Sequence, residues 1–458
     1  MSRAGAGDSP ASYGRGAALL SALIGVTGLL TYAFHSIAAH VLGADDYGLI
    51  AVLWAAVFLV ASIIYRPVEQ LLSRTIAERR ARDRPIGDAL RVAATIQLGL
   101  AVAFVAVALV LRDPIQDDLF SGDSTLYWCL IAAVTFYAAS YFARGFLAGE
   151  QRFALYGGLV LMEAASRVVF VVLLAVGVVD SENVAAIAVA AAPLLSLFVV
   201  PWALGRHVRR MAPSAEQSAA EATEPEFTLS HGLGFAGAVL VIMCSEQAIL
   251  NSGVLIVKVE TGNDELAALI FAVLMIARAP LQLFQAVSTT LLPHLTRLLV
   301  EEEEGDAGDF GRSVRLTVTA CLAFGAATVV GVLLVGPPVM RLLFGEEFDY
   351  DRVGLAMVAA GMGLYLSATT VNQAVLAQGR APLAAASWAV AAAFFVVFLL
   401  VAQMEEVREV EVAFLATAGV LSALLYVAYR SAPHVGQRIR PGSSEELEAR
   451  LAALDEGS

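Results

Sequence analysis

The chain has 458 residues, 59% of them hydrophobic, and a formal net charge of −13. Soluble domains contain about 45–50% apolar residues, so this composition, with its mean hydropathy of +0.74, excludes an ordinary water-soluble globular protein. The acidic residues fall mainly in short segments between apolar runs, so the net charge gives no reason to expect a nucleic-acid partner.

Apolar runs recur along the whole chain, and a helix of about 20 such residues crosses a hydrocarbon core about 30 Å thick. In chain order they cover about 17–41, 47–65, 89–111, 125–147, 153–177, 183–204, 233–257, 265–291, 313–335, 353–377, 383–403 and 410–429. We therefore predict an all-α integral membrane protein of twelve transmembrane helices, multi-pass in the cell (inner or plasma) membrane.

Charged residues predict how the chain is oriented in the membrane. Segment 66–91 holds a dense set of arginines, namely Arg66, Arg74, Arg79, Arg80, Arg82, Arg84 and Arg91. Loops on the opposite side are acidic, such as Gly345-Glu-Glu-Phe-Asp349. Because basic loops stay on the cytoplasmic side, we expect segment 66–91 and both termini to be cytoplasmic.

An Ala-, Glu-, Ser- and Pro-rich segment interrupts the apolar runs at their midpoint. We predict a cytosolic tail at 1–16, an N-lobe at 17–205, a cytosolic linker at 206–232, a C-lobe at 233–430 and a second cytosolic tail at 431–458. Each lobe would then contain six spans.

Short motifs of the first half return in the same order in the second half. Gly43-Ala-Asp-Asp46 matches Gly262-Asn-Asp-Glu265, and Arg66-Pro-Val-Glu-Gln70 matches Arg278-Ala-Pro-Leu-Gln282. Two further pairs are Asp118–Gly122 with Leu343–Glu347, and Phe146–Arg152 with Val375–Arg380. Four ordered matches predict an internal repeat of six helices. An even number of spans gives both halves the same direction, so their symmetry axis would run along the membrane normal.

Several of these segments resemble the polysaccharide-export flippases, the O-antigen type of lipid-linked oligosaccharide translocase within the multidrug/oligosaccharidyl-lipid/polysaccharide exporter superfamily. The segments that carry the resemblance are Leu42–Gly48, the basic linker after residue 65, Arg144–Phe153 with Glu163–Arg167, and Gly336–Gly345. The resemblance covers about 15–430. It implies a V-shaped bundle of two pseudo-symmetric lobes, with a central polar cavity that opens alternately to either side.

A lipid-linked sugar chain sets clear chemical demands on such a cavity. Each unpaired hydroxyl costs roughly 4–8 kcal/mol on entering hydrocarbon, so the sugars need a wet groove while the lipid tail stays in the bilayer. A pyrophosphate head needs cations, and arginine binds phosphate as a bidentate fork.

Arg278 is the main candidate for that cation, because it falls near the middle of the run 265–291. Gln282 and Gln285 follow it on one helical face. The other candidates for a substrate-binding cavity are Glu246, Gln247, Asn251, Arg66 and Gln70.

Structural alternatives stay open for these candidates. Arg278 and Glu246 would also suit an interhelical ion pair, and Glu246 would also suit proton or ion coupling. Asn251 is typical of hydrogen bonds between membrane helices, and Arg66 lies near enough to the interface to snorkel.

Glu163 and Arg167 put two charges in the middle of an apolar run, where each costs about 2.5–3.5 kcal/mol if isolated. Their spacing lets them pair on one face. The pair fits either a buried clamp inside the N-lobe or a substrate contact. Because it neutralises itself, Arg278 is the better candidate for the pyrophosphate.

The sequence lacks the residues that several functional classes require. The single lysine, Lys258, follows a valine, so no Gly-Lys phosphate-binding loop exists. Cys129, Cys244 and Cys321 have no metal or disulfide spacing, and His35 and His40 read as outer-rim residues rather than ligands. We expect no cofactor and no metal.

We predict a non-enzymatic flippase for a polyprenyl-pyrophosphate-linked oligosaccharide in cell-surface polysaccharide biosynthesis. Its partners would be that substrate, the lipid bilayer and other polysaccharide-assembly membrane proteins. The alternatives are a multidrug and toxin extrusion-type cation antiporter, a lipid II flippase, or a membrane glycan polymerase or glycosyltransferase. The short outer loops argue against the enzymes.

Overall fold

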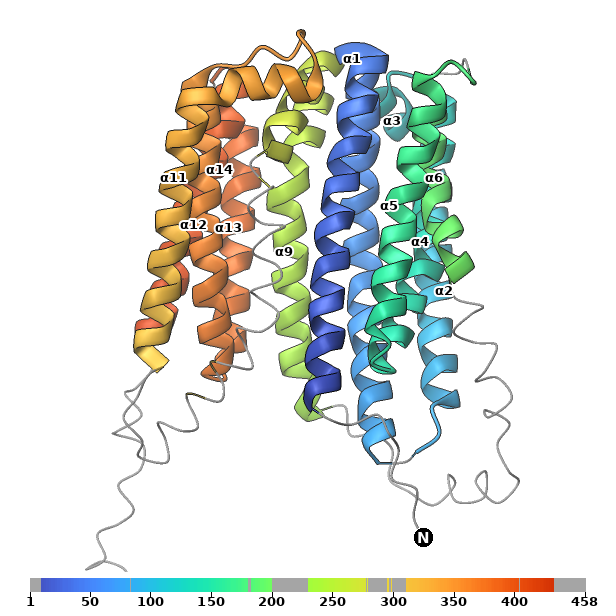
Figure 1. The fold of residues 1–458 in the computed structure, drawn as a ribbon, viewed down its shortest axis with the longest axis vertical. Helices are drawn as coiled ribbons and strands as arrows, with labels where there is room; N and C mark the ends of the chain where they lie inside the picture. The colour runs from blue at the N-terminus through green and yellow to red at the C-terminus, as the bar shows by residue number, and fades with distance from the viewer. Residues whose placement is uncertain are drawn as a thin grey trace, which may run out of the picture.

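The computed structural model is helical throughout the part of the chain that it describes. These residues are 10–82, 84–179, 183–199, 230–276, 310–402 and 404–431, with single residues 278, 295 and 298. Within these ranges, nine helices are long and apolar enough to cross a membrane (Figure 1). This confirms a predominantly apolar, multi-helix chain, while the count of twelve spans stays a prediction.

Helix α1 (Pro10–Ala81) is two helices joined at a break. The break is Gly43, whose φ of 77° lies in the left-handed region. Only a residue without a Cβ adopts this conformation at little cost. The two arms of α1 cover the predicted runs 17–41 and 47–65, so the Gly43 turn falls where the sequence places the first outer loop.

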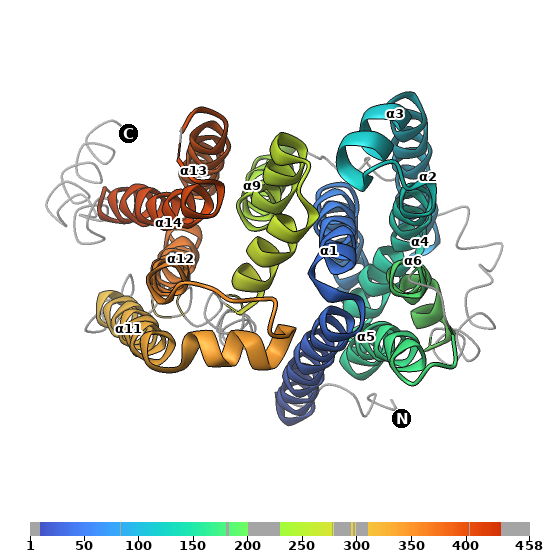
Figure 2. The same ribbon diagram turned by 90° about the horizontal axis from the view of Figure 1, so that it is seen from above.

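The helices of the first half lie together on the side of α1 that faces away from α9, and we call this group, with α1, the N-lobe (Figure 2). Helices α4 and α5 both pack against α1 and against α6, and α2 packs on α1 and α4. The bounds are α2 (Gly87–Val110), α3 (Arg112–Pro114), η1 (Ile115–Leu119), α4 (Ser124–Gly149), α5 (Phe153–Ala175), α6 (Val184–Ser196) and η2 (Leu197–Val199).

The second group forms the C-lobe, in which α12 packs against α11 and α14, and α13 packs against α9 and α14. Its members are α9 (Ser230–Thr261), the helical residues 264–276, α11 (Phe310–Phe344), α12 (Arg352–Ala377), α13 (Ala381–Val401) and α14 (Glu406–Arg430). Helix α9 begins at residue 230, inside the predicted linker 206–232. The rest of that linker and both predicted tails lie mainly outside the described residues.

The repeat seen in the sequence has a counterpart in the backbone of the turns. Left-handed residues occur at Gly43 and Gly262, at Gly122 and Gly345, and at Gln151 and Gly379. Each pair lies within matching motifs of the two halves. The helices after the second pair also start alike, because Asp123 caps α4 and Asp351 caps α12.

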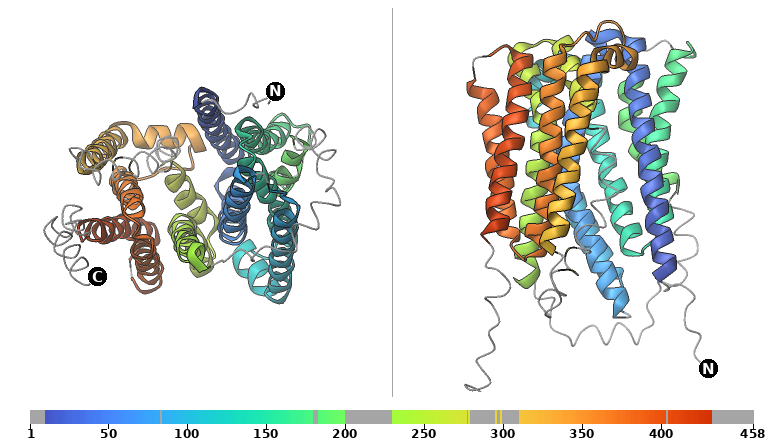
Figure 3. Two further views of the ribbon diagram at one scale, coloured as in Figure 1. Left: turned by 90° about the horizontal axis from the view of Figure 1, so that it is seen from below. Right: turned by 60° about the vertical axis from the view of Figure 1, so that its left-hand side comes forward.

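The outward faces of the bundle are apolar, as membrane contact requires. Exposed side chains include Leu98 and Val110 of α2, and Leu316 and Leu334 of α11. A soluble monomer rarely exposes apolar surface on this scale. Figure 3 shows that the long helices of the bundle run roughly along the long axis of the molecule.

Candidate functional site

The two lobes meet through an aromatic contact at the end of the molecule where α1 bends. The ring centroid of Tyr47 lies 5.8 Å from that of Phe348 and 6.3 Å from those of Phe271 and Phe344. The ring of His35 lies 4.8 Å from that of Phe271, and His35 is fully buried. The prediction that His35 is an outer-rim residue is therefore wrong, because packing against the C-lobe covers it.

Polar groups join the lobes at the same end. The backbone N–H of Ala44 donates to Glu347 Oε2 at 2.8 Å. Lys258 Nζ donates to Ser121 Oγ at 2.7 Å and lies 2.5 Å from Asp264 Oδ1, while Ser121 Oγ donates to Asp264 Oδ2 at 3.0 Å. We call the region of these aromatic and polar contacts the closed end.

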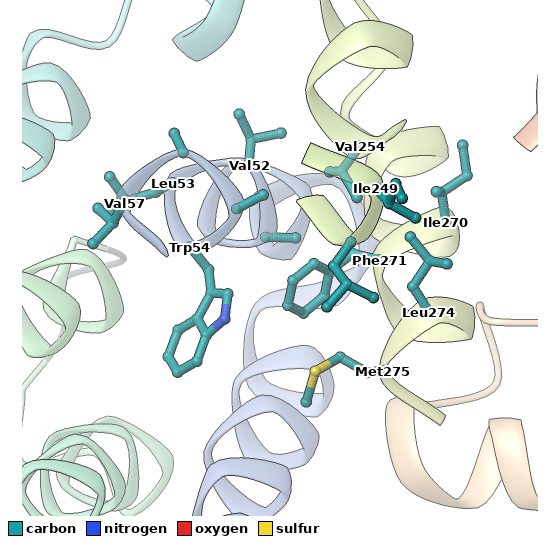
Figure 4. Packing of buried hydrophobic residues seen from close by; sticks show 14 of the residues in the cluster. Val52, Leu53, Trp54, Val57, Ile249, Val254, Ile270, Phe271, Leu274 and Met275 are labelled. Carbon is teal, nitrogen blue, oxygen red and sulfur yellow. The ribbon is translucent and has the colours of Figure 1, made fainter. Parts of the chain in front are cut away.

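Apolar packing extends this contact toward the middle of the molecule. One buried cluster contains residues of α1, of α9 and of the segment 264–276. In Figure 4, Trp54 of α1 lies near Phe271 and Met275, and Val52 lies on the side of α1 that is nearer to Val254.

A charge pair crosses between the lobes farther from the closed end. Arg66 Nη1 of α1 lies 4.0 Å from Glu246 Oε2 of α9, and the two side chains are 37% and 24% exposed. Tyr365 of α12 donates a long hydrogen bond of 3.4 Å to Glu246 Oε1. At about 1.5 Å per helical residue, Glu246 lies roughly 22 Å from the end of α9 at Thr261. The pair is therefore near the middle of a membrane-spanning helix.

Arg278 lies beside this pair but does not join it. Its Nη1 donates to Asn251 Oδ1 at 3.4 Å, whereas Nε and Nη2 are buried and have no hydrogen-bond partner among the residues that the structure describes. The alternative of an ion pair between Arg278 and Glu246 is not formed, because Glu246 faces Arg66 instead.

The remaining candidates differ in their positions. Gln247 Oε1 accepts a hydrogen bond of 3.1 Å from Asn251 Nδ2, one turn away on α9. Gln70 is exposed, whereas its neighbour Glu69 is buried and accepts a hydrogen bond of 3.1 Å from Tyr156. Gln282 and Gln285 lie outside the described residues.

Glu163 and Arg167 form a tight network within the N-lobe. Glu163 Oε1 lies 2.5 Å from Arg167 Nη2 and accepts a hydrogen bond of 2.6 Å from Tyr137, while Oε2 pairs with Arg144. The guanidinium of Arg167 also lies 4.8 Å from the ring centroid of Trp54. Glu163 and Arg167 offset each other, but Arg144 adds a second positive charge. The network therefore has a net charge of +1, not the zero that the sequence suggested.

Arg144 was missed as a partner of Glu163, although the sequence places it in the same resembling stretch. It lies on α4, and its contact with α5 depends on how these helices are rotated against each other. Arg144 lies near the end of the predicted run 125–147, so its position in the sequence did not mark it as a buried charge in need of a partner.

Taken together, the charges between the lobes suit an anion better than a cation. Arg66 and Glu246 balance each other, and Arg278 adds a positive charge that no carboxylate among the described residues offsets.

In the described part of the chain, no cluster of three His, Cys, Asp or Glu residues could hold a metal ion.

Comparison with curated proteins finds relatives without an assigned activity, and no family model matches the chain. An uncharacterized protein of Mycobacterium tuberculosis (Rv3630) is 24% identical over 374 residues, covering 77% of this chain and 78% of the relative. An uncharacterized protein of Mycobacterium bovis (Mb3654) matches to the same extent.

Solved structures of transporters share the fold over most of their length. An inward-facing multidrug resistance MATE family transporter of the MOP superfamily matches with a TM-score of 0.63 at 14% identity, covering 89% of this chain and 96% of the other. An outward-facing structure of such a transporter matches with a TM-score of 0.58 at 15% identity, covering 91% and 95%. A Vibrio cholerae MATE transporter in a bent form matches with 0.55 at 16% identity, covering 92% and 97%. The chain is therefore a multi-pass membrane protein with the fold of MATE family transporters of the MOP superfamily.

Proposed function

We propose that the protein is a flippase that moves a polyprenyl-pyrophosphate-linked oligosaccharide outward across the cell membrane, for cell-surface polysaccharide biosynthesis. Its transporter fold supports membrane transport by alternating access. The observation that carries the proposal is Arg278, a half-buried cation whose Nε and Nη2 are buried and which has no carboxylate partner among the described residues.

The free donors of Arg278 have the right geometry for a phosphate. Nε–H and one N–H of Nη2 point outward along the same edge of the planar guanidinium, and such an edge forms a fork that matches two oxygens of one phosphate. A charged group inside a membrane protein is costly and typically has a functional role. A diphosphate would satisfy both donors and offset the charge at once.

The second cation near the site comes from the other lobe. Arg66 belongs to α1 of the N-lobe, whereas Arg278 belongs to the C-lobe. A diphosphate carries enough oxygens to engage both arginines. An anionic head group would thus contact both lobes, so its binding would respond to how the lobes are arranged.

The test uses cells that lack the gene and carry either the wild-type protein or a variant. We expect Arg278→Ala to accumulate lipid-linked oligosaccharide on the cytosolic leaflet as strongly as the deletion does, with normal protein levels in the membrane. The control is Arg91→Ala, which removes an exposed arginine of α2 that pairs with Asp88 at 3.3 Å. Full transport by Arg278→Ala would remove Arg278 from the site.

Cation extrusion is the second candidate, and two observations favour it. The structural neighbours include multidrug resistance transporters, and Glu69 is a buried carboxylate of α1 with no ion pair among the described residues. If the deletion leaves lipid-linked oligosaccharides unchanged but lowers the efflux of cationic dyes, this function replaces the flippase.

A further inference from the structure

Two glutamates within the membrane-spanning helices are held very differently. Glu163 has three partners, with Tyr137 at 2.6 Å and Arg167 at 2.5 Å besides Arg144, and its side chain is 4% exposed. Glu246 reaches Arg66 only at 4.0 Å and Tyr365 at 3.4 Å, and its side chain is 24% exposed. Glu163 is therefore fixed in place, whereas Glu246 is loosely held and accessible.

The long distances around Glu246 mean weak contacts. A distance of 4.0 Å is the limit of an ion pair, and a hydrogen bond of 3.4 Å lies beyond the usual range. Partly exposed pairs of this kind contribute about 0–1 kcal/mol. A stronger anion that reaches Arg66 would displace the carboxylate at little cost.

We infer that Glu246 is an internal competitor for the anionic group of the substrate: it neutralises Arg66 until a phosphate takes its place beside Arg66 and Arg278. The inference rests on the proposed anion-binding role of Arg278. It assigns to Glu246 a role in affinity and release, rather than in coupling to a proton or in holding the lobes together.

The reason for such a competitor is release of the substrate. A site with two uncompensated arginines would bind a diphosphate tightly in both lobe arrangements, and uniform tight binding does not speed turnover. A nearby carboxylate repels the bound anion and recaptures Arg66 as it leaves. Affinity falls, and release becomes faster.

Replacing Glu246 by glutamine tests this role with little change of shape. We expect Glu246→Gln to bind inorganic pyrophosphate about tenfold more tightly than wild type, which corresponds to about 1.4 kcal/mol. Binding is measured by isothermal titration calorimetry on full-length protein in detergent. In cells, the same variant should transport more slowly, because release is slower.

Two further variants make the outcome decisive. Glu260→Gln makes the same chemical change at an exposed site on α9 and should bind pyrophosphate like wild type. Arg278→Ala should lose binding. Size-exclusion profiles identify any variant that does not fold.

Each outcome has one meaning. If wild type binds, Arg278→Ala does not, and Glu246→Gln binds equally or more weakly, the competitor role is overturned while the anion site stands. If neither wild type nor Glu246→Gln binds pyrophosphate at millimolar concentration, both the anion site and the competitor role fall.

Discussion

The buried network around Glu163 shows how single residues solve the problem of charge inside a membrane. One carboxylate pairs with two guanidinium groups, and Tyr137 adds a hydrogen bond to the same oxygen that faces Arg167. Both arginines also lie against aromatic rings, with Arg144 at 4.9 Å from the centroid of Tyr141. Desolvated cations above aromatic faces gain up to about 2 kcal/mol. The network joins α4 to α5 and to the second arm of α1.

Removing that carboxylate should be strongly destabilising. Glu163→Gln leaves Arg144 and Arg167 buried without a counter-charge, and breaking a buried pair in this way costs about 3–5 kcal/mol. We expect a clearly lower midpoint of thermal unfolding in detergent. Asp88→Asn, which breaks an ion pair whose side chains are 81% and 48% exposed, should change stability by less than about 1 kcal/mol. Equal midpoints for the two variants would contradict a clamp.

At the scale of helices, the break in α1 sets the geometry of the closed end. Gly43 lets the second arm start beside the C-lobe, and the N–H of Ala44 then finds its acceptor on Glu347 across the interface. Gly48, four residues after Ala44, packs directly on the backbone of Asp264. A Cβ added at Gly48 would lie 2.0 Å from the carbonyl oxygen of Asp264.

A larger side chain at Gly48 should therefore separate the lobes at this end. We expect Gly48→Val to lengthen the distance between spin labels at the exposed positions Asp117 and Glu346. The measurement is double electron–electron resonance in a background without Cys129, Cys244 and Cys321. Gly99→Val is the control, since no atom lies within 4 Å of a Cβ built there. Unchanged distances in folded Gly48→Val protein would contradict a close interface.

Much of the helix layout could be predicted from the sequence, and less of the site. The predicted runs 125–147, 153–177 and 353–377 agree with α4, α5 and α12 to within a few residues, because length and apolarity are local properties of the chain. The partner of Glu246 could not be predicted. The sequence offers both Arg66 and Arg278 as basic residues that could pair with Glu246. Only the packing of the helices shows that Arg66 is the one that lies beside it.

For the whole molecule, the contacts between the lobes gather at the end that carries the Gly43 and Gly262 turns. The described contacts there include aromatic rings, a helix start capped by Glu347 and the cluster of Lys258 with Ser121 and Asp264. Farther along, the contact between lobes includes the weak pair of Arg66 and Glu246. In the proposed transport by alternating access, rocking of the two lobes would break the first set of contacts when the protein opens at that end.

The orientation in the membrane is testable for the whole molecule. From the distribution of arginines we expect the closed end to face outward. A cysteine at Glu346 should then react with a membrane-impermeant maleimide on intact cells. A cysteine at Arg82, which is exposed at the opposite end, should react only after permeabilisation. The reverse pattern would invert the topology and the direction of transport.

The sequence by itself determined that the chain is a helical membrane protein, where most helices run, and that motifs recur in two halves. These properties follow from local composition and from the thickness of the bilayer. Tertiary structure alone decided that Arg144 joins Glu163, that His35 is buried, and that two donors of Arg278 have no partner in the part of the chain that the structure describes. Such contacts depend on the rotation of each helix about its axis, which is set by packing against helices distant in the chain.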